Sequence, residues 1–325
     1  MHPINRHPRY RKYGLISLLC LLSNMALSVV WAESTGDTNK VQASEYSKKG
    51  ADTCLKCHNE TSEFAVLSIF KTKHAALADA RTPFAGLQCE ACHGPGAEHS
   101  RKVGSGEQRQ LIINFGEKSL LSTKAQNQVC LVCHNKRGRI FWQSSSHEGQ
   151  GVVCVNCHRI HVPQDPVLTR LTQPEICFVC HQQARAEFFK PSSHLMRFGK
   201  LGCSDCHRAH GAISEALLSM PTLNETCFRC HAQMRGPYLW EHAPAAEDCR
   251  LCHLPHGSIH PALLVKRLPL LCQQCHSQAG HPSLALDGSG LADGNPSALL
   301  LAGGCINCHA QVHGSNHPSG AKLMR

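Results

Sequence analysis

The pattern of apolar and polar positions predicts little regular secondary structure in this chain. One long apolar run, Leu15 to Val30, lies near its start. After Ala32 no run reaches the roughly 18 apolar residues that a membrane-spanning helix needs. Alternation of apolar and polar residues is nowhere sustained enough to predict a long continuous strand. We therefore expect short helices and much coil.

Four short segments favour a helical turn that leads into a paired-cysteine motif, described below. Gly or Pro follows many of these motifs and would end the turn. We expect each turn to present the last residue of its motif, a histidine. The turns are predicted after Thr53, Gln128, Ile176 and Thr226.

The residues around the apolar run predict a targeting segment. Residues 1–13 carry four basic side chains and no acid, and Val30 and Ala32 are compact residues at the −3 and −1 positions of a cleavage site. This is typical of a secretory signal peptide over 1–32, with 33–325 as the mature chain. A retained membrane anchor is the alternative. A lipoprotein is disfavoured because Leu19, not a small residue, precedes Cys20, and no twin-arginine pattern is present.

One five-residue motif, Cys-Xaa-Xaa-Cys-His, occurs ten times and uses twenty of the 21 cysteines. Its cysteine pairs are Cys54 and Cys57, Cys89 and Cys92, Cys130 and Cys133, Cys154 and Cys157, Cys177 and Cys180, Cys203 and Cys206, Cys227 and Cys230, Cys249 and Cys252, Cys272 and Cys275, and Cys305 and Cys308. Its histidines are His58, His93, His134, His158, His181, His207, His231, His253, His276 and His309.

This spacing predicts covalent attachment of c-type haem. Two thiols can add to the two vinyl groups of one porphyrin while the following imidazole binds its iron. A zinc site or a disulfide scaffold also uses paired cysteines, but neither requires a histidine after every second one. We therefore predict ten c-type haems and a compartment that permits their attachment, the bacterial periplasm or beyond.

Ten haems would dominate the interior of so short a chain. Each porphyrin would have only about 30 residues around it, too few to build a separate core of normal size, and aromatic residues make up 5% of the chain. The haems themselves should form the core.

The formal net charge of +10 would be offset by twenty haem propionates, so it does not indicate nucleic-acid binding.

Histidines outside the motifs bracket alternate motifs. The brackets are His74 and His99 around Cys89, His147 and His161 around Cys154, His194 and His210 around Cys203, His242 and His256 around Cys249, and His281 and His313 around Cys305. Ten bracket histidines match the ten sixth ligands that bis-His haems require, which leaves His260 and His317 as surface residues. The alternative for any one of them is an exposed polar side chain, and His281, His313 and His317 compete near one haem.

A plain motif followed by a bracketed one forms a two-haem module, and five such modules are predicted. They span about 50–99, 126–165, 173–215, 223–260 and 268–320. His161, His210 and His256 lie three residues after a motif histidine, so they should ligate a neighbouring haem and hold adjacent haems close together. Because every iron would have two histidines, no open catalytic haem is expected, and we predict an electron-transfer protein and not an enzyme.

Four stretches carry a resemblance to a known family. They are AGLQCEACHGPGAEH (Ala85 to His99), RGPYLWEHAP (Arg235 to Pro244), LCQQCH (Leu271 to His276) and QVHGSNHPSG (Gln311 to Gly320). With the ten-motif layout, they resemble the MtrA/DmsE family of periplasmic decahaem cytochromes. The resemblance implies a multihaem cytochrome c in which short α-helices and coil wrap a linear chain of ten haems.

The resemblance also implies a function and partners. Relatives insert into an outer-membrane β-barrel porin and relay electrons between periplasmic or inner-membrane cytochromes and an extracellular multihaem cytochrome or metal, in iron reduction or iron oxidation. We therefore expect periplasmic localisation with attachment to the outer membrane through the barrel, and no nucleic acid. The alternative is a soluble periplasmic carrier that feeds another oxidoreductase.

Overall fold

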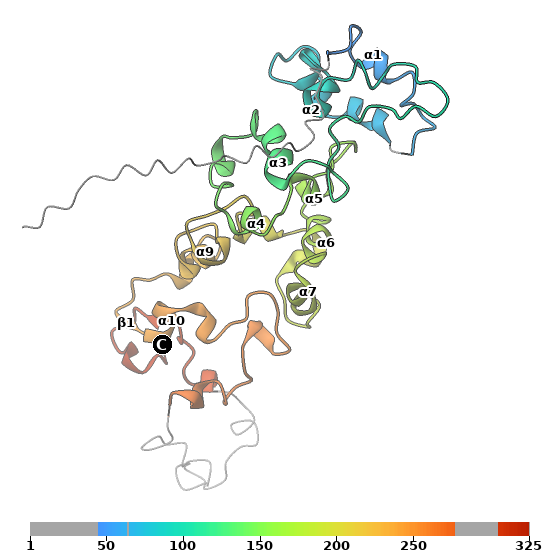
Figure 1. The fold of residues 1–325 in the computed structure, drawn as a ribbon. Helices are drawn as coiled ribbons and strands as arrows, with labels where there is room; N and C mark the ends of the chain where they lie inside the picture. The colour runs from blue at the N-terminus through green and yellow to red at the C-terminus, as the bar shows by residue number, and fades with distance from the viewer. Residues whose placement is uncertain (1–44, 64, 277–304, 325) are drawn as a thin grey trace, which may run out of the picture. The chain divides into compact units, whose positions relative to one another are not determined.

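The computed structural model describes residues 45–63, 65–276 and 305–324 (Figure 1). The predicted signal peptide, 1–32, and the predicted ligand His281 lie outside these ranges. Within them no helix is long and apolar enough to cross a membrane.

Short helices joined by coil make up the described chain, as the sequence predicts. The longest α-helix, α3, has nine residues. The α-helices are α1 Ala51–Cys54, α2 Glu90–His93, α3 Thr123–Leu131, α4 Ser146–Gly149, α5 Cys154–Cys157, α6 Gln173–Phe178, α7 Gln182–Phe188, α8 Cys203–Cys206, α9 Leu223–Phe228 and α10 Ala243–Glu247.

Single 3₁₀ turns and one small sheet complete the described structure. The turns are η1 Val66–Lys71, η2 Lys73–Ala75, η3 Pro83–Ala85, η4 Arg137–Arg139, η5 Pro166–Leu168, η6 Leu195–Phe198, η7 Glu215–Leu217, η8 Ala232–Met234, η9 Cys249–Leu251, η10 Pro261–Leu263, η11 Cys272–Gln274, η13 Cys305–Asn307 and η14 Gly320–Lys322. Strands β1 Trp240–Glu241 and β2 Gly314–Ser315 pair antiparallel, with Trp240 opposite Ser315. This pairing ties the fourth predicted module to the fifth.

The four predicted helical turns exist but begin earlier than the sequence analysis places them. Helices α1, α3, α6 and α9 start before the motif and end within or just after its first cysteine. In α3 and α9 the cause is the N-cap, because Ser122 accepts from the Ala125 N–H and Thr222 from the Glu225 N–H. Each of these four motifs therefore begins in the last turn of a helix, and its histidine follows the end of that helix.

Little apolar surface is buried by the polypeptide itself. Eight hydrophobic residues are buried in the described chain, whereas 24 large ones are exposed. Val132 and Val179, which lie between the two cysteines of their motifs, are 68% and 72% exposed. Such a chain cannot hold its fold by side-chain packing alone, so it needs a further apolar body beside its motifs.

Buried amide side chains join the two motifs of three predicted modules. Asn127, 2% exposed, accepts from the Cys154 N–H at 2.8 Å and donates to the Val152 carbonyl at 3.1 Å. Asn224 accepts from the Cys249 N–H at 2.9 Å in the same way. Gln173 accepts from the Ser204 N–H at 3.0 Å. Each amide fixes the start of one motif against the helix that carries another.

Glycine is required after two of the bracket histidines. Gly211 follows His210 at φ +109° and Gly257 follows His256 at φ +156°. A Cβ at Gly211 would collide with the Phe141 carbonyl, and one at Gly257 with the Glu187 carbonyl. Both positions therefore combine a left-handed backbone with close approach of a distant segment.

Replacing Asn127 by Ala should lower the free energy of unfolding by about 1–3 kcal/mol, because it leaves the partly buried Cys154 N–H and Val152 carbonyl without their partner. The measurement is chemical denaturation of the haem-loaded protein, followed by far-ultraviolet circular dichroism. Gln150→Ala, at an exposed glutamine, is the matched control and should change stability little. Equal stability of the two variants would contradict this role for Asn127.

Candidate haem-binding site

All ten motifs share one local turn. In each, the N–H of the histidine donates to the carbonyl of the first cysteine, at 2.9–3.1 Å. This turn gathers two sulfurs and one imidazole within five residues. None of the twenty motif cysteines, all of which lie in the described ranges, is in a disulfide. Every motif therefore retains the two thiols that attachment to a porphyrin consumes.

The first cysteines of the two motifs in each predicted module lie together. The Cys54 thiol hydrogen-bonds to Cys89, and this contact raises the pKa of Cys54 and lowers that of Cys89 to about 7. The same kind of contact joins Cys130 to Cys154, Cys177 to Cys203, Cys227 to Cys249 and Cys272 to Cys305. A lowered pKa increases the share of the reactive thiolate.

The histidines lie in facing pairs. Nine of the ten motif histidines face a bracket histidine, with ring centres 5.9–6.4 Å apart. The pairs are His58 with His99, His134 with His74, His93 with His161, His181 with His147, His158 with His210, His231 with His194, His207 with His256, His276 with His242, and His253 with His313. Each pair combines residues distant in the sequence.

These pairs have the dimensions of a metal site. Two imidazoles on opposite sides of one metal, each bonded at about 2 Å, would place their ring centres about 6 Å apart. The ring planes meet at angles from 8° to 81° while the separation stays nearly constant. Aromatic stacking would fix the angle, whereas ligation along a shared axis fixes only the distance. The pairs therefore fit the two axial positions of a haem iron.

Eight of the nine pairs cross from one predicted module to the next, whereas His58 and His99 both belong to the first module. His161, His210 and His256 each lie opposite the motif histidine of the module before their own. The first bracket histidine of modules one to four faces the plain motif of the following module, as His74 faces His134. The tenth motif histidine, His309, is described, whereas the bracket histidine that is in none of these pairs, His281, lies outside the described residues.

The two surplus histidines lie elsewhere. Within the described residues, neither His260 nor His317 faces a motif histidine. The Nδ1 atom of His317 instead accepts a hydrogen bond from the Ser319 N–H at 3.2 Å.

Hydrogen bonds at Nδ1 orient the paired imidazoles and leave Nε2 for a metal. Most of these bonds go to backbone carbonyls, as from His93 to Ile113 at 2.7 Å and from His194 to Pro255 at 2.9 Å. Two go to carboxylates. His158 donates to Asp165 at 2.7 Å, and His256 to Glu187 at 3.2 Å.

Burial keeps several of these imidazoles neutral. Loss of solvent is the main cause that lowers the pKa of five of them. A neutral imidazole has a lone pair available for a metal, so this environment favours ligation. The five are His93, His134, His207, His210 and His313.

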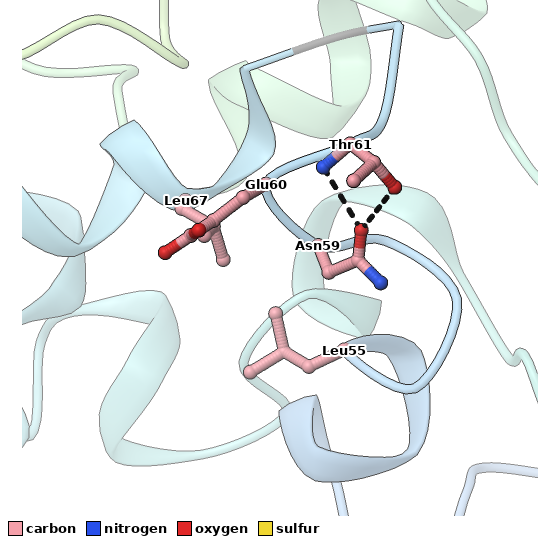
Figure 2. A pocket seen from close by; sticks show the side chains of 5 residues that line it. All are labelled: Leu55, Asn59, Glu60, Thr61 and Leu67. Carbon is pink, nitrogen blue, oxygen red and sulfur yellow. Dashed lines mark hydrogen bonds between the residues drawn. The ribbon is translucent and has the colours of Figure 1, made fainter.

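A hollow of about 340 Å³ lies beside the first motif (Figure 2). Leu55, which stands between Cys54 and Cys57, lines it together with Leu67. Its polar edge is held by Asn59, whose Oδ1 accepts from the N–H and the hydroxyl of Thr61 at 3.0 and 2.7 Å. Leu55 and Leu67 give the hollow an apolar side, and Asn59, Glu60 and Thr61 give it a polar one.

A second feature suits the charged groups of a haem. The buried Nε1 of Trp142 is, in the described part of the chain, the one buried side-chain nitrogen or oxygen without a hydrogen-bond partner. Its ring lies 6.2 Å from that of His210, so a propionate at this site could accept its hydrogen bond.

By contrast, the described residues contain no group of three or more His, Cys, Asp and Glu side chains placed to hold a bare metal ion.

Comparison with known proteins gives the family. The chain is 46% identical over 295 residues to the multihaem cytochrome MtrA of Shewanella baltica, which is 90% of this chain and 86% of that protein. The chain belongs to the MtrA family of multihaem cytochromes. It is also 30% identical over 125 residues to the cytochrome c-type protein NrfB of Haemophilus influenzae, over 34% of this chain and 55% of that protein.

Family models match the MtrA-type chain in several segments. The doubled CXXCH motif matches residues 197–236 and 242–281, the NrfB-like cytochrome c-type protein matches 89–171, and cytochrome c554 and c-prime matches 26–94. The predicted family and fold class are therefore confirmed. The protein is a multihaem electron-transfer cytochrome c that carries several covalently attached haems.

The histidine pairs predict different outcomes for two nearby substitutions. In the His210→Ala variant, the iron bound by His158 should keep only one protein ligand, because no other histidine of the described chain faces His158. We expect one high-spin haem per molecule by low-temperature electron paramagnetic resonance, and a raised potential at that site. The matched control, His260→Ala, should leave the spectrum unchanged. Equal spectra for the two variants would contradict the pairing.

Proposed function

We propose that the chain binds ten c-type haems, each between a motif histidine and a bracket histidine. Nine facing pairs support nine of these sites. His309 and His281 complete the set by position in the sequence. With both axial positions taken by imidazole, no iron is open to a substrate, so electron transfer and not catalysis is the function that this arrangement supports.

The observation that carries this proposal is the continuity of the pairs. Each predicted module shares a histidine pair with the next, and the first cysteines of its two motifs are in contact. Neighbouring haems attached in this way would lie edge to edge within a module and be linked by a shared ligand segment between modules. Ten sites in such a series would form one uninterrupted path for electrons.

We propose further that this path crosses the outer membrane inside a β-barrel porin. The support is the similarity to MtrA over 90% of the chain together with the predicted export signal. A barrel can enclose a polar lumen and satisfy the lipid-facing backbone, so a haem-filled polypeptide could fill it. Periplasmic or inner-membrane cytochromes would exchange electrons at one end and an extracellular multihaem cytochrome or metal at the other.

Haem content tests the first proposal. Pyridine haemochrome analysis of the purified protein, divided by protein concentration from amino-acid analysis, should give ten c-type haems per chain, because each motif attaches one. A Cys154→Ala, Cys157→Ala double variant should give nine. Five or fewer haems in the parent protein, or stoichiometric zinc, would overturn the proposal.

Reconstitution tests the conduit. The protein, together with the porin that co-purifies with it, should let a reduced dye trapped inside lipid vesicles be oxidised by a ferric chelate outside. Vesicles that contain the porin alone are the control and should show no such transfer. Full release of the protein with the soluble periplasm, with no porin bound, would instead favour the carrier that serves another oxidoreductase.

A further inference from the structure

The partner of one motif histidine differs in charge from its counterparts in the repeat. The Nδ1 atoms of His207 and His253 each bond to the carbonyl nine residues later, Ala216 and Ala262, both at 2.8 Å. His158 bonds instead to a carboxylate seven residues later, Asp165, at 2.7 Å. Positions seven residues after the other two histidines hold Ser214 and His260.

The backbone of the turn changes together with this partner. Turns η5, η7 and η10 occupy the same place after their motif histidines, from the eighth to the tenth residue. In η7 and η10 the last two residues are left-handed, with φ of +51° and +55° in one and +54° and +59° in the other. Turn η5 has no left-handed residue. The left-handed turn, which is unfavourable for L residues, occurs where a carbonyl must reach the imidazole.

Asp165 is held in place as an ionic partner. Its Oδ1 accepts from the N–H groups of Arg159 and Val167, both at 3.3 Å, and its side chain is 12% exposed. Among the described residues its one contact with a basic side chain is the hydrogen bond from His158, so no Lys or Arg side chain pairs with it there. Glu187, the carboxylate at His256, is more distant and 24% exposed, so the stronger case is Asp165.

A carboxylate at Nδ1 changes what the imidazole does at Nε2. It draws the Nδ1 proton and gives the ring imidazolate character, which makes the ring a stronger donor to a metal. Its negative charge, in a partly buried setting, also favours ferric over ferrous iron. We propose that Asp165 lowers the reduction potential of the haem held by His158 and His210. It acts as a positioning residue that makes the fourth site of the series release its electron more readily.

This inference rests on the proposed bis-His ligation, and one substitution separates the two. Asp165→Asn keeps an oxygen acceptor for Nδ1 but removes the charge. In a potentiometric titration of the haem-loaded protein, followed by low-temperature electron paramagnetic resonance, one of the ten low-spin components should move to a more positive potential. Its spin state should not change, because both imidazoles remain.

Two further variants secure the test. Asp165→Ser keeps a side chain that can cap η5 and should give the same positive shift. It therefore tests the inference even if the Asn variant fails to fold. Asp205→Asn removes a carboxylate that lies within a motif but pairs with Arg170 at 2.9 Å, and it should shift no component as far. Low-spin spectra with no positive shift in either Asp165 variant would overturn the inference alone. High-spin iron in the parent protein would overturn the ligation and the inference together.

Discussion

The fold depends on pairs of imidazoles that face each other. Their ring centres lie 5.9–6.4 Å apart, which leaves room for one metal ion bonded to both rings. The described polypeptide buries too few apolar residues to hold distant segments together, and its longest α-helix has nine residues. Pairs such as His93 with His161 and His253 with His313 connect segments more than fifty residues apart. Under the proposed ligation, metal binding and folding are therefore the same event, and ligand bonds take the place of a hydrophobic core.

Several features were readable from the residues alone, each for a physical reason. The five-residue spacing of cysteines and histidine leaves few other chemistries, which is why covalent haem and a coil-rich fold class could be predicted. The family was recognised from four longer stretches that resemble it. The position of His161, three residues after His158, predicted a partner in a neighbouring module, and its ring faces that of His93. The N-cap at Thr222, followed by Glu225, was a signal for the start of α9 that the sequence analysis did not use.

Other features depend on contacts that sequence spacing does not encode. Asp165 resembles any surface acid until η5 turns it toward His158. Asn127 and Asn224 look like exposed helix residues, and their burial follows from docking against a second motif. The partner of His74 is a histidine sixty residues later, and the loops between them set that distance. A motif predicts the chemistry of a site. The residues that surround the site, and that adjust its properties, are set by tertiary structure.

Under the proposed ligation and the predicted export, the shared histidine pairs would impose an order on maturation. His93 can be matched only after His161 has emerged, and His158 only after His210. As residues cross the membrane in sequence order, each new segment supplies the missing ligand to a site already exported, while its own bracketed motif waits for the next. A chain that is truncated between modules would therefore carry an incomplete iron site at its last bracketed motif. Assembly would then proceed from the first module to the last, and the site at His253 would be completed only by His313.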